Sequence, residues 1–239
     1  LLSQITKKEV VYEFRKNDII NGGQGAPLTP IFHFLLKKNL KEKSLIFLNI
    51  GGIANETFIY QNNKFSAKDL GPGNCLIDKW IKIHTKKHYD DKGMIARSGK
   101  VNKLILNQGL DIFLNSKIYN KKSYDIKDFD LSFVRGLSLE EGAATITEFT
   151  AEILSKKISS KNIYSCGGGR KNTFLIERLE DKLGTKINEI EKLDLDGDFV
   201  ESQAFGYLAV RSYLKLPISF PETTGCKKPT TGGKIIKFK

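Results

Sequence analysis

The stretch "SLIFLNIGGIANETFIYQNNKFSAKDLGPGNCLIDKW", residues 44–80, predicts the beginning of a layered sheet. Residues 44–52 form a continuous apolar run that ends in a glycine pair, which is typical of a buried strand. Residues 57–60 show an alternating pattern, and an Asn-rich turn follows at 61–63. We therefore expect a hairpin to follow the first strand almost at once, with its second strand ending at Asp69.

A glycine-proline turn comes next. Residues 70–73, "LGPG", suit neither a helix nor a strand, so we expect a rigid hinge that holds Asp69 at a strand end. Asn74 is a candidate N-cap for a helix that runs to about His84, but it could equally contact a ligand. Asp69 itself could act chemically, or it could accept hydrogen bonds from the glycine N–H groups of the turn.

The rest of the chain alternates helix and strand. The pattern predicts these further elements: a strand within 5–14, a long loop at 15–30, a short helix at 31–40, a helix at 138–157, a strand, a triple glycine and a helix within 162–183, a strand at 185–190, a last helix at 200–214 and an irregular tail. A Lys- and Asp-rich insertion at about 87–137 should carry a helix at 101–108 that Gly109 ends. Hairpin-linked strands followed by helix–strand alternation predict an α/β fold with a mixed sheet and helices on both of its faces.

Composition narrows the class of protein. The 239 residues are 40% hydrophobic and 28% charged, as in a soluble globular protein, and they suffice for one large domain or two lobes. No run of 18 apolar residues exists, so we expect no membrane partner. The net charge of +12 could indicate a nucleic-acid partner. However, the lysines are scattered and no arginine stripe interleaves with aromatic residues, so we expect no nucleic-acid partner.

Cysteine and histidine spacing argues against a metal centre. Cys75, Cys166 and Cys226 are far apart and odd in number, and none belongs to a CxxC pair. We expect them to be buried thiols in a reducing compartment, which predicts a cytoplasmic protein. His84 and His88 lie four residues apart without a third ligand, so no side-chain metal site is predicted.

Two glycine clusters are candidates for phosphate contacts, because a residue without Cβ lets backbone N–H groups approach an anion. Gly51-Gly52 joins two strands, and Gly167-Gly168-Gly169 lies between a strand and a helix. Neither cluster fits GxGxxG or GxxxxGK[ST], so a Rossmann fold and a P-loop are not indicated. The order strand–GG–strand–strand–Asp turn–helix, then strand–GGG–helix, resembles the second lobe of the actin-like ATPase and sugar kinase superfamily. In that superfamily one turn holds the terminal phosphates and the later one the adenosine.

Within that superfamily, several segments resemble the anhydro-N-acetylmuramic acid kinases. They are, in chain order, "GGQGAPLTPIFH" (22–33), "NIGGIAN" (49–55), "DLGPGNCLIDKW" (69–80), "YDDKGMIARSGKV" (89–101), "CGGGRKN" (166–172), "GDFVESQAFGYLAVR" (197–211) and "LPISFPETTG" (216–225). The resemblance implies an actin-like (ribonuclease H-like) sugar kinase fold with two lobes, the first incomplete. Residues 1–44 would be a remnant of the first lobe, 45–215 the nucleotide-binding lobe, and 216–239 a tail that returns to the first lobe.

The chemistry implied by the resemblance is a coupled hydrolysis and phosphorylation. Water opens the 1,6-anhydro ring of anhydro-N-acetylmuramic acid, and O6 takes the γ-phosphate of ATP with the help of Mg²⁺. The products are N-acetylmuramic acid 6-phosphate and ADP, in peptidoglycan recycling. The resemblance also implies a homodimer. The family begins with a Gly-, Ser- and Thr-rich phosphate loop that this chain lacks, so a catalytically incompetent nucleotide-binding fragment is the alternative.

The resemblance also assigns site residues. Asp69 would be the base that activates water, and Glu201 would help it, although a first-turn carboxylate that complements the helix dipole would look the same. The nucleotide-binding residues would be Gly51, Gly52, Asn55, Gly167, Gly168, Gly169 and Asn172. The substrate-binding residues would be Gln24, Gly25, Asn74 and Arg15.

Some of these assignments leave alternatives open. The loop that carries Gln24 and Gly25 could be a plain connector, and Arg15 could pair with Asp18 instead of a sugar. Asp198 could be only an N-cap. In two places the chain departs from the family pattern. Leu70 stands where the family has threonine, and the basic "KS" element survives only as Lys122-Ser123.

Overall fold

A computed structural model describes residues 2–38, 40–121 and 123–238 of the chain. The chain divides into two compact units. Unit 1 comprises Leu1–Ser44, Thr57–Ala67 and Phe199–Lys239, and unit 2 comprises Leu45–Glu56 and Lys68–Asp198. The lobe boundaries expected from the sequence stay a prediction.

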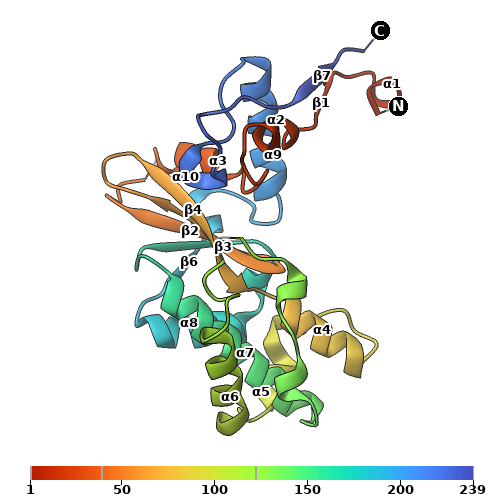
Figure 1. The fold of residues 1–239 in the computed structure, drawn as a ribbon, viewed down its shortest axis with the longest axis vertical. Coiled ribbons are helices and arrows are strands. Elements are labelled where there is room, and N and C mark those ends of the chain that lie inside the picture. Colours follow the sequence, from red (N-terminus) through yellow and green to blue (C-terminus); the bar gives the residue numbers. More distant parts are fainter. Residues whose placement is uncertain (1, 39, 122, 239) are drawn as a thin grey trace. The chain divides into compact units, whose positions relative to one another are not determined.

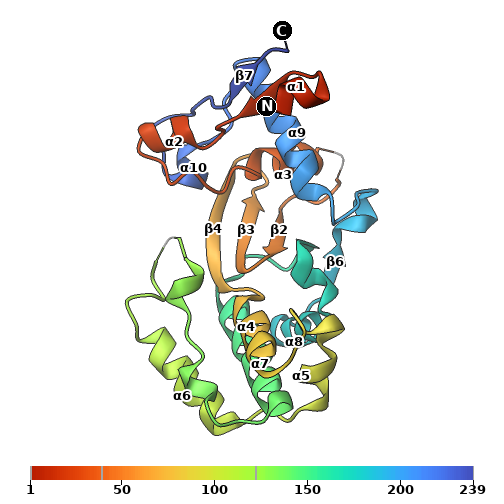
Figure 2. The same ribbon diagram turned by 90° about the vertical axis from the view of Figure 1, so that its right-hand side faces the viewer.

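A five-stranded sheet has the strand order β4-β3-β2-β5-β6 (Figure 1). Its strands are β2 (Leu45–Ile50), β3 (Ile53–Ile59), β4 (Phe65–Pro72), β5 (Ile163–Cys166) and β6 (Ile187–Glu189). β2 pairs in parallel with β5, with Leu48 opposite Ser165, and β5 pairs in parallel with β6. Short turns join β2, β3 and β4, and such turns reverse the chain direction (Figure 2). The predicted α/β class with a mixed sheet is therefore confirmed.

The central strand β2 is the apolar heart of this sheet. Five of its six side chains are completely buried: Leu45, Ile46, Phe47, Leu48 and Ile50. Burying one such side chain contributes about 1.5–3 kcal/mol. A strand covered on both faces reads as a continuous apolar run, which is why its sequence pattern identified it.

The long helix α7 (Leu139–Lys157) organises the helices of unit 2. It packs against α4 (Cys75–His84), α5 (Met94–Ser98), α6 (Lys103–Leu114) and α8 (Thr173–Leu183). Ser138 caps α7, since its Oγ accepts a hydrogen bond from the Glu141 N–H at 3.2 Å. Acidic residues in the first turn and lysines in the last turn complement the helix dipole. The helix predicted at 138–157 is confirmed.

Unit 1 has its own small core. Its elements are α1 (Leu2–Thr6), β1 (Val10–Tyr12), α2 (Lys16–Ile20), α3 (Pro30–Lys37), α9 (Val200–Tyr213), α10 (Pro221–Thr224) and β7 (Lys234–Ile236). β1 and β7 form an antiparallel pair, with Val10 opposite Ile236. The buried centre consists of Leu28, Ile31, Leu208 and Ile218, surrounded by aromatic side chains. Phe14 and Phe205, for example, meet edge to face at 5.4 Å.

Two expectations about glycine were wrong. The hinge expected at 70–73 does not begin after Asp69, because β4 continues to Pro72. Gly71 allows this with a φ of +155°, which L side chains rarely adopt. Gly109 does not end a helix but lies inside α6. A Cβ there would be 2.6 Å from the Phe133 ring, so the glycine makes room for that ring.

The two ends of the chain also differ from expectation. The strand expected within 5–14 is confined to Val10–Tyr12, and α1 precedes it. The tail expected to be irregular contains α10 and β7. The pairing of β1 with β7 joins residues more than 200 positions apart, and local sequence patterns carry no signal for such a pairing.

Candidate functional site

The two glycine turns and the start of α4 meet at one edge of the sheet. Because β2 and β5 are parallel neighbours, the turns that follow them lie beside the same strand ends, where α/β folds commonly bind ligands. The Gly52 carbonyl accepts a hydrogen bond from the Gly73 N–H at 2.9 Å. The Gly51 carbonyl accepts one from the Asn74 N–H at 2.8 Å. Three motifs that are separate in sequence thus form one structure.

The triple-glycine turn packs tightly on β2. A Cβ on Gly167 would lie 2.2 Å from Asn49 Oδ1, and one on Gly169 would lie 2.2 Å from Ile50 Cγ2. Gly167 also has a φ of +79°. A Cβ on Gly168 would meet nothing within 4 Å. Two of the glycines therefore serve packing, while the backbone of Gly168 faces open space and can approach a ligand.

A pocket of about 340 Å³ opens beside this turn. It is lined by Asn74, Asp78, Tyr89, Asp90, Asp91, Lys92, Gly168, Lys171 and Asn172. Its volume falls in the usual range for small-molecule sites. Of the predicted residues, the structure brings Asn74, Gly168 and Asn172 together here. Asp78, Lys171 and residues 89–92 were not predicted as site residues, although all of them lie within the family-like segments 69–80, 89–101 and 166–172.

Two polar residues of the pocket wall hold helices in place. The Asp90 carboxylate accepts hydrogen bonds from the Ile95 and Ala96 N–H groups, both at 2.9 Å, at the start of α5. Asn172 Oδ1 accepts from the Leu175 N–H at 3.0 Å and so caps α8. Asn74 occupies the N-cap position of α4, as predicted, but its side chain makes no capping hydrogen bond.

Two lysines and a half-buried carboxyl are further charged groups of the pocket. Lys92 and Lys171 are exposed, and Lys171 pairs with Asp198 at 2.6 Å. Burial raises the pKa of Asp78 above its ordinary value, and the Lys82 charge opposes that rise only in part. The pocket thus offers cations at its rim and a half-buried carboxyl in its wall.

Arg170 links the triple-glycine turn to two carboxylates later in the chain, those of Glu191 and Asp198. Its guanidinium pairs with Glu191 at 2.9 Å and with Asp198 at 3.0 Å, and it donates to the Gly167 carbonyl at 3.1 Å. Its side chain is only 8% exposed. Asp198 therefore serves as an ion-pair partner. The residue that precedes α9 is Phe199, which provides no side-chain cap.

Asp69 lies in β4, half-buried, with one carboxylate oxygen occupied. Its Oδ2 accepts hydrogen bonds from the Tyr124 N–H at 2.9 Å and from Ser123 Oγ at 3.2 Å. Burial raises the pKa of Asp69, and these two donors and the Lys157 charge oppose the rise. The Gly73 N–H donates to Gly52 and not to Asp69, so it does not support the capping alternative.

The family-like residues around Asp69 have clear places. Ser123 of the "KS" element contacts the carboxylate, while Lys122 lies outside the described residues. Leu70 is completely buried. Neighbouring strand residues point to opposite faces, so the side chain at 70 faces away from that of Asp69. The change from threonine therefore removes no group from the Asp69 side of the strand.

The predicted residues Arg15, Gln24, Gly25 and Glu201 belong to unit 1. The Arg15 guanidinium donates to the Gly25 carbonyl at 2.8 Å, and the buried Asp18 accepts from the Gly25 N–H at 2.7 Å. Arg15 and Asp18 therefore both hold the loop instead of pairing. Gln24 is exposed, and Glu201 is exposed in the first turn of α9, the position that the dipole alternative requires. Asn55 belongs to unit 2, half-buried in β3.

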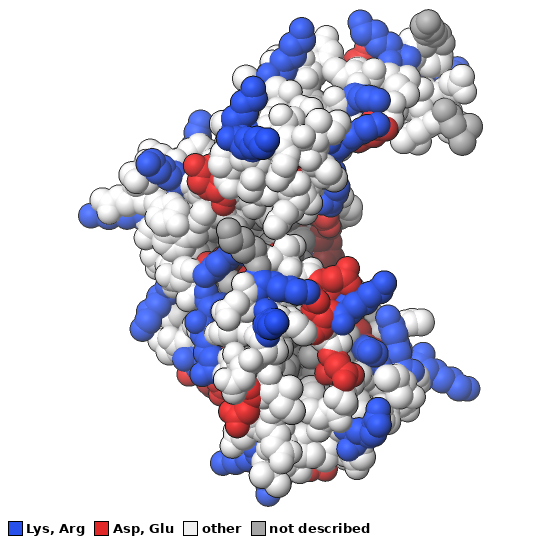
Figure 3. Space-filling view, in the orientation of Figure 1, with Lys and Arg blue, Asp and Glu red and all other residues white. Residues whose placement is uncertain are grey.

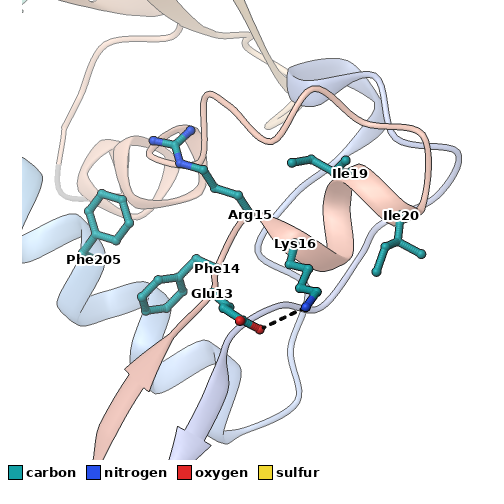
Figure 4. A pocket seen from close by; sticks show the side chains of 7 residues that line it. All are labelled: Glu13, Phe14, Arg15, Lys16, Ile19, Ile20 and Phe205. Atoms are coloured by element: carbon teal, nitrogen blue, oxygen red, sulfur yellow. Dashed lines mark ion pairs between the residues drawn. The ribbon is translucent and has the colours of Figure 1, made fainter. Parts of the chain in front are cut away.

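Unit 1 also contains an open pocket of about 510 Å³ (Figure 4). It is lined by Glu13, Phe14, Arg15, Lys16, Ile19, Ile20 and Phe205. Glu13 and Lys16 pair across its rim at 3.8 Å. Sequence patterns did not reveal it, because Phe205 is distant from the other residues in the chain.

Several global properties accompany these sites. Figure 3 shows Lys and Arg side chains scattered among acidic ones over the visible face. All three cysteines are buried, as predicted, and none forms a disulfide among the described residues. Among the described residues, no three His, Cys, Asp or Glu side chains could together hold a metal ion. In the same part of the chain, no helix has the length and apolar character needed to cross a membrane.

The family model and the curated relatives that match this chain carry the same family name. The family model for anhydro-N-acetylmuramic acid kinase matches residues 1–237. A protein of that name from Pelagibacter ubique (strain HTCC1062) is 51% identical, with 99% of this chain and 67% of that protein covered. The protein of that name from Zymomonas mobilis is 42% identical, and the alignment covers 98% of this chain and 65% of that protein. The one from Agrobacterium fabrum is 39% identical, and the alignment covers 99% of this chain and 66% of that protein. The chain thus spans about two thirds of the length of these relatives.

Among solved structures, a xylulose kinase from Rhodospirillum rubrum aligns with a TM-score of 0.46 and 9% identity. The alignment covers 73% of this chain and 39% of that one. A likeness at this level carries no argument about function.

Proposed function

Because the chain belongs to the anhydro-N-acetylmuramic acid kinase family, we propose that it carries the nucleotide site and the catalytic base of such a kinase. The reaction is the hydrolytic opening of the 1,6-anhydro ring and the transfer of the ATP γ-phosphate to O6. The products are N-acetylmuramic acid 6-phosphate and ADP. The enzyme would work as a homodimer in the cytoplasm, in peptidoglycan recycling.

The nucleotide assignment rests on the convergence of the glycine turns. The adenosine of ATP would occupy the pocket beside Gly168, whose backbone is open to a ligand. The terminal phosphates would lie near Gly51-Gly52, with Asn55 in the adjoining strand. Lys92 and Lys171 would supply positive charge at the pocket rim. Gly167, Gly169 and Asn172 act indirectly in this proposal, because they hold the turn and α8 in place.

The donor set fits Mg²⁺ that arrives with the nucleotide. Mg²⁺ usually binds through substrate phosphates, waters and one or two carboxylates, and seldom in an all-protein cage. The Asp78 and Asp91 carboxylates of the pocket would supply such ligands. When bound, the ion would neutralise charge on the transferring phosphoryl group.

The catalytic assignment rests on a single observation, the hydrogen bonding of the Asp69 carboxylate. Its Oδ2 is held by two donors, and no hydrogen bond to Oδ1 is present among the described residues. Oδ1 is therefore available to accept a proton from water. The water oxygen attacks the anomeric carbon, the bond from that carbon to O6 breaks, and the freed O6 attacks the γ-phosphate while ADP leaves. The raised pKa of Asp69 makes it a stronger base than an ordinary aspartate.

The substrate side is assigned to unit 1. We propose Arg15, Gln24 and Gly25 of unit 1 and, separately, Asn74 of unit 2 as sugar contacts, and Glu201 as a helper in catalysis. The support for Gln24 is its exposure on a loop whose backbone is fixed, since Asp18 and Arg15 both bind Gly25.

The test is phosphorylation of anhydro-N-acetylmuramic acid by the full chain, followed by mass spectrometry. We expect Asp69→Asn to abolish turnover and to leave ATP affinity within about twofold, since no Asp69 atom lines the nucleotide pocket. Asp181→Asn, a change at an exposed residue that lines neither pocket, is the control. An active Asp69→Asn variant would assign the base elsewhere. If the parent chain binds ATP but does not phosphorylate the sugar, it is a binding fragment only.

A further inference from the structure

A lysine lies behind the loop that holds Asp69. Lys157, the last residue of α7, donates from Nζ to the Tyr119 carbonyl at 2.7 Å and to the Tyr124 hydroxyl at 2.5 Å. The Tyr124 hydroxyl in turn donates to the Tyr119 carbonyl at 2.7 Å. The ammonium also lies 4.3 Å and 4.9 Å from the centroids of the Tyr119 and Tyr124 rings. Such contacts stabilise a cation in a half-buried place.

The residue that Lys157 holds is the residue that binds Asp69. The Tyr124 N–H makes the shorter of the two hydrogen bonds to Asp69 Oδ2, and its neighbour Ser123 makes the other. The Tyr124 side chain is 8% exposed, so its ring anchors this part of the loop in the protein. A displacement of that ring would move both donors away from the carboxylate.

The main chain of Lys157 is fixed as well. Lys68, the residue before Asp69 in β4, donates from Nζ to the Lys157 carbonyl at 2.8 Å and to Ser159 Oγ at 3.0 Å. Lys68 also pairs with the buried Glu56 at 3.3 Å. The end of α7 is thereby fixed to β4 at the residue adjacent to Asp69.

We infer that Lys157 is a positioning residue for Asp69. It holds Tyr119 and Tyr124, and so fixes the Tyr124 N–H and the neighbouring Ser123 hydroxyl that donate to one carboxylate oxygen, and it adds a positive charge near that carboxylate. This inference rests on the proposed role of Asp69 as the base.

The charge state of Lys157 should make the pKa of Asp69 depend on pH. Burial, with help from the Lys68 charge, lowers the pKa of Lys157 to about 8, while Asp69 opposes the shift. Burial first, and then the neighbouring acidic groups, raise the pKa of Tyr124 to about 12, so its hydroxyl stays protonated. Among the described residues, the titratable groups that face Lys157 are Lys68 and Asp69 from β4 and the two tyrosines. Above about pH 8 the ammonium loses its charge, and the pKa of Asp69 should rise further.

The decisive measurement is a ¹³C NMR titration of the Asp69 carboxyl group in the full chain, assigned by comparison with Asp69→Asn. In the parent chain we expect a second inflection near pH 8 from Lys157. Lys157→Met should remove that inflection and raise the pKa of Asp69 by about 0.5–1 unit. Lys157→Arg should keep the lower pKa and move the second inflection to far higher pH. Lys156→Met, on the exposed neighbouring lysine, is the matched control.

Kinetics provide the second readout. Lys157→Met should lower kcat about 10-fold with little change in the KM for ATP, and the acid limb of its pH profile should follow the raised pKa of Asp69. Lys157→Arg should restore most of kcat. Tyr124→Phe, which keeps the backbone donor and removes only the hydroxyl, should give an intermediate loss even if Lys157→Met does not fold.

The outcomes separate this inference from the proposed function. If Lys157→Met and Lys156→Met give the same Asp69 titration, the positioning role is wrong, whatever the activity. If Lys157→Met does not fold, Tyr124→Phe and Lys157→Arg titrations identical to that of the parent chain would overturn it equally. If Asp69 titrates as predicted but Asp69→Asn stays active, the coupling is real and the proposed base is wrong.

Discussion

Gly73 packs against the carbonyl oxygen of Gly51, so closely that a Cβ atom on Gly73 would lie 2.3 Å from that oxygen. Real Cβ contacts of this kind do not occur below 3.0 Å. The opposing atom belongs to the backbone, so it cannot rotate away as a side chain would. The turn before α4 and the turn between β2 and β3 are thus in direct contact, and glycine is required where they meet.

Gly73→Ala should therefore destabilise the protein. We expect a loss of about 1–3 kcal/mol in the free energy of unfolding, because overpacking forces backbone shifts. Urea denaturation followed by circular dichroism measures it. Gly168→Ala is the matched control, since nothing lies within 4 Å of its Cβ position. Its stability should change by less than about 0.5 kcal/mol while its ATP affinity falls. Equal stability of the two variants would refute the close approach.

Lys171→Met should weaken ATP binding about 10-fold, because a charged hydrogen bond to phosphate contributes about 1.5 kcal/mol or more. Lys171 lines the pocket, and its known partner Asp198 is exposed. Calorimetric titration with ATP and with adenosine makes the test specific. Lys186→Met, an exposed lysine outside the pocket, should leave both affinities unchanged. An equal loss for adenosine would show that Lys171 does not contact phosphate.

Glu148 should make stability depend on acid pH. Burial raises the pKa of Glu148, but Arg178 at 2.7 Å and Lys182 at 2.6 Å outweigh it, and the net pKa lies below 4.5. A carboxyl with a lowered folded-state pKa stabilises the fold above the unfolded value and loses that contribution as pH falls through the folded value. At pH 7 we expect Glu148→Gln to cost about 2 kcal/mol.

The difference between Glu148→Gln and the parent chain should shrink below about pH 4. Urea denaturation across pH 3–7 measures it. Glu177→Gln is the control, because that pair with Arg97 is exposed and should contribute less than about 1 kcal/mol. A gap for Glu148→Gln that stays constant with pH would contradict the assigned ion pairs.

Asp18→Asn should loosen the loop that carries Gln24. Asp18 is 1% exposed, and its two oxygens accept from the Gly25 N–H at 2.7 Å and from Thr224 Oγ1 at 2.6 Å. In the asparagine variant an NH₂ group replaces one of these oxygens and faces a hydrogen-bond donor. We expect this to lower the free energy of unfolding by about 1–3 kcal/mol. Thermal unfolding and limited proteolysis within 21–27 measure the effect. Glu9→Gln, the same acid-to-amide change at an exposed residue, should leave the proteolysis rate unchanged, and equal rates in both variants would contradict the clamp.

The elements foreseen from the sequence are those that local patterns specify. β2 is a buried apolar run, and α7 combines helical periodicity with a serine cap, so both were predicted near their true bounds. The pairing of β1 with β7 depends on residues at opposite ends of the chain, and periodicity contains nothing about it. Gly109 misled because glycine usually ends helices, whereas here it accommodates an aromatic ring.

The candidate site was foreseen as residue types but not as contacts. The two glycine clusters were chosen because phosphate sites favour glycine, and their union at one sheet edge follows from the parallel pairing of β2 and β5. The partners of Asp69 could not be predicted. Ser123 and Tyr124 lie more than 50 residues away in the chain, and only Ser123 carried a signal, as part of the family's "KS" element.

The burial of β2 has a consequence for how the protein opens. Its backbone amides lie at the centre of the five strands and behind side chains that are completely buried. Exchange of these amides with deuterated solvent should require the largest unfolding event, whereas the edge strand β6 can exchange through local fraying. Since the Gly51-Gly52 turn follows β2 directly, the proposed phosphate site is attached to the slowest-exchanging segment of the chain. It should stay assembled through most spontaneous openings.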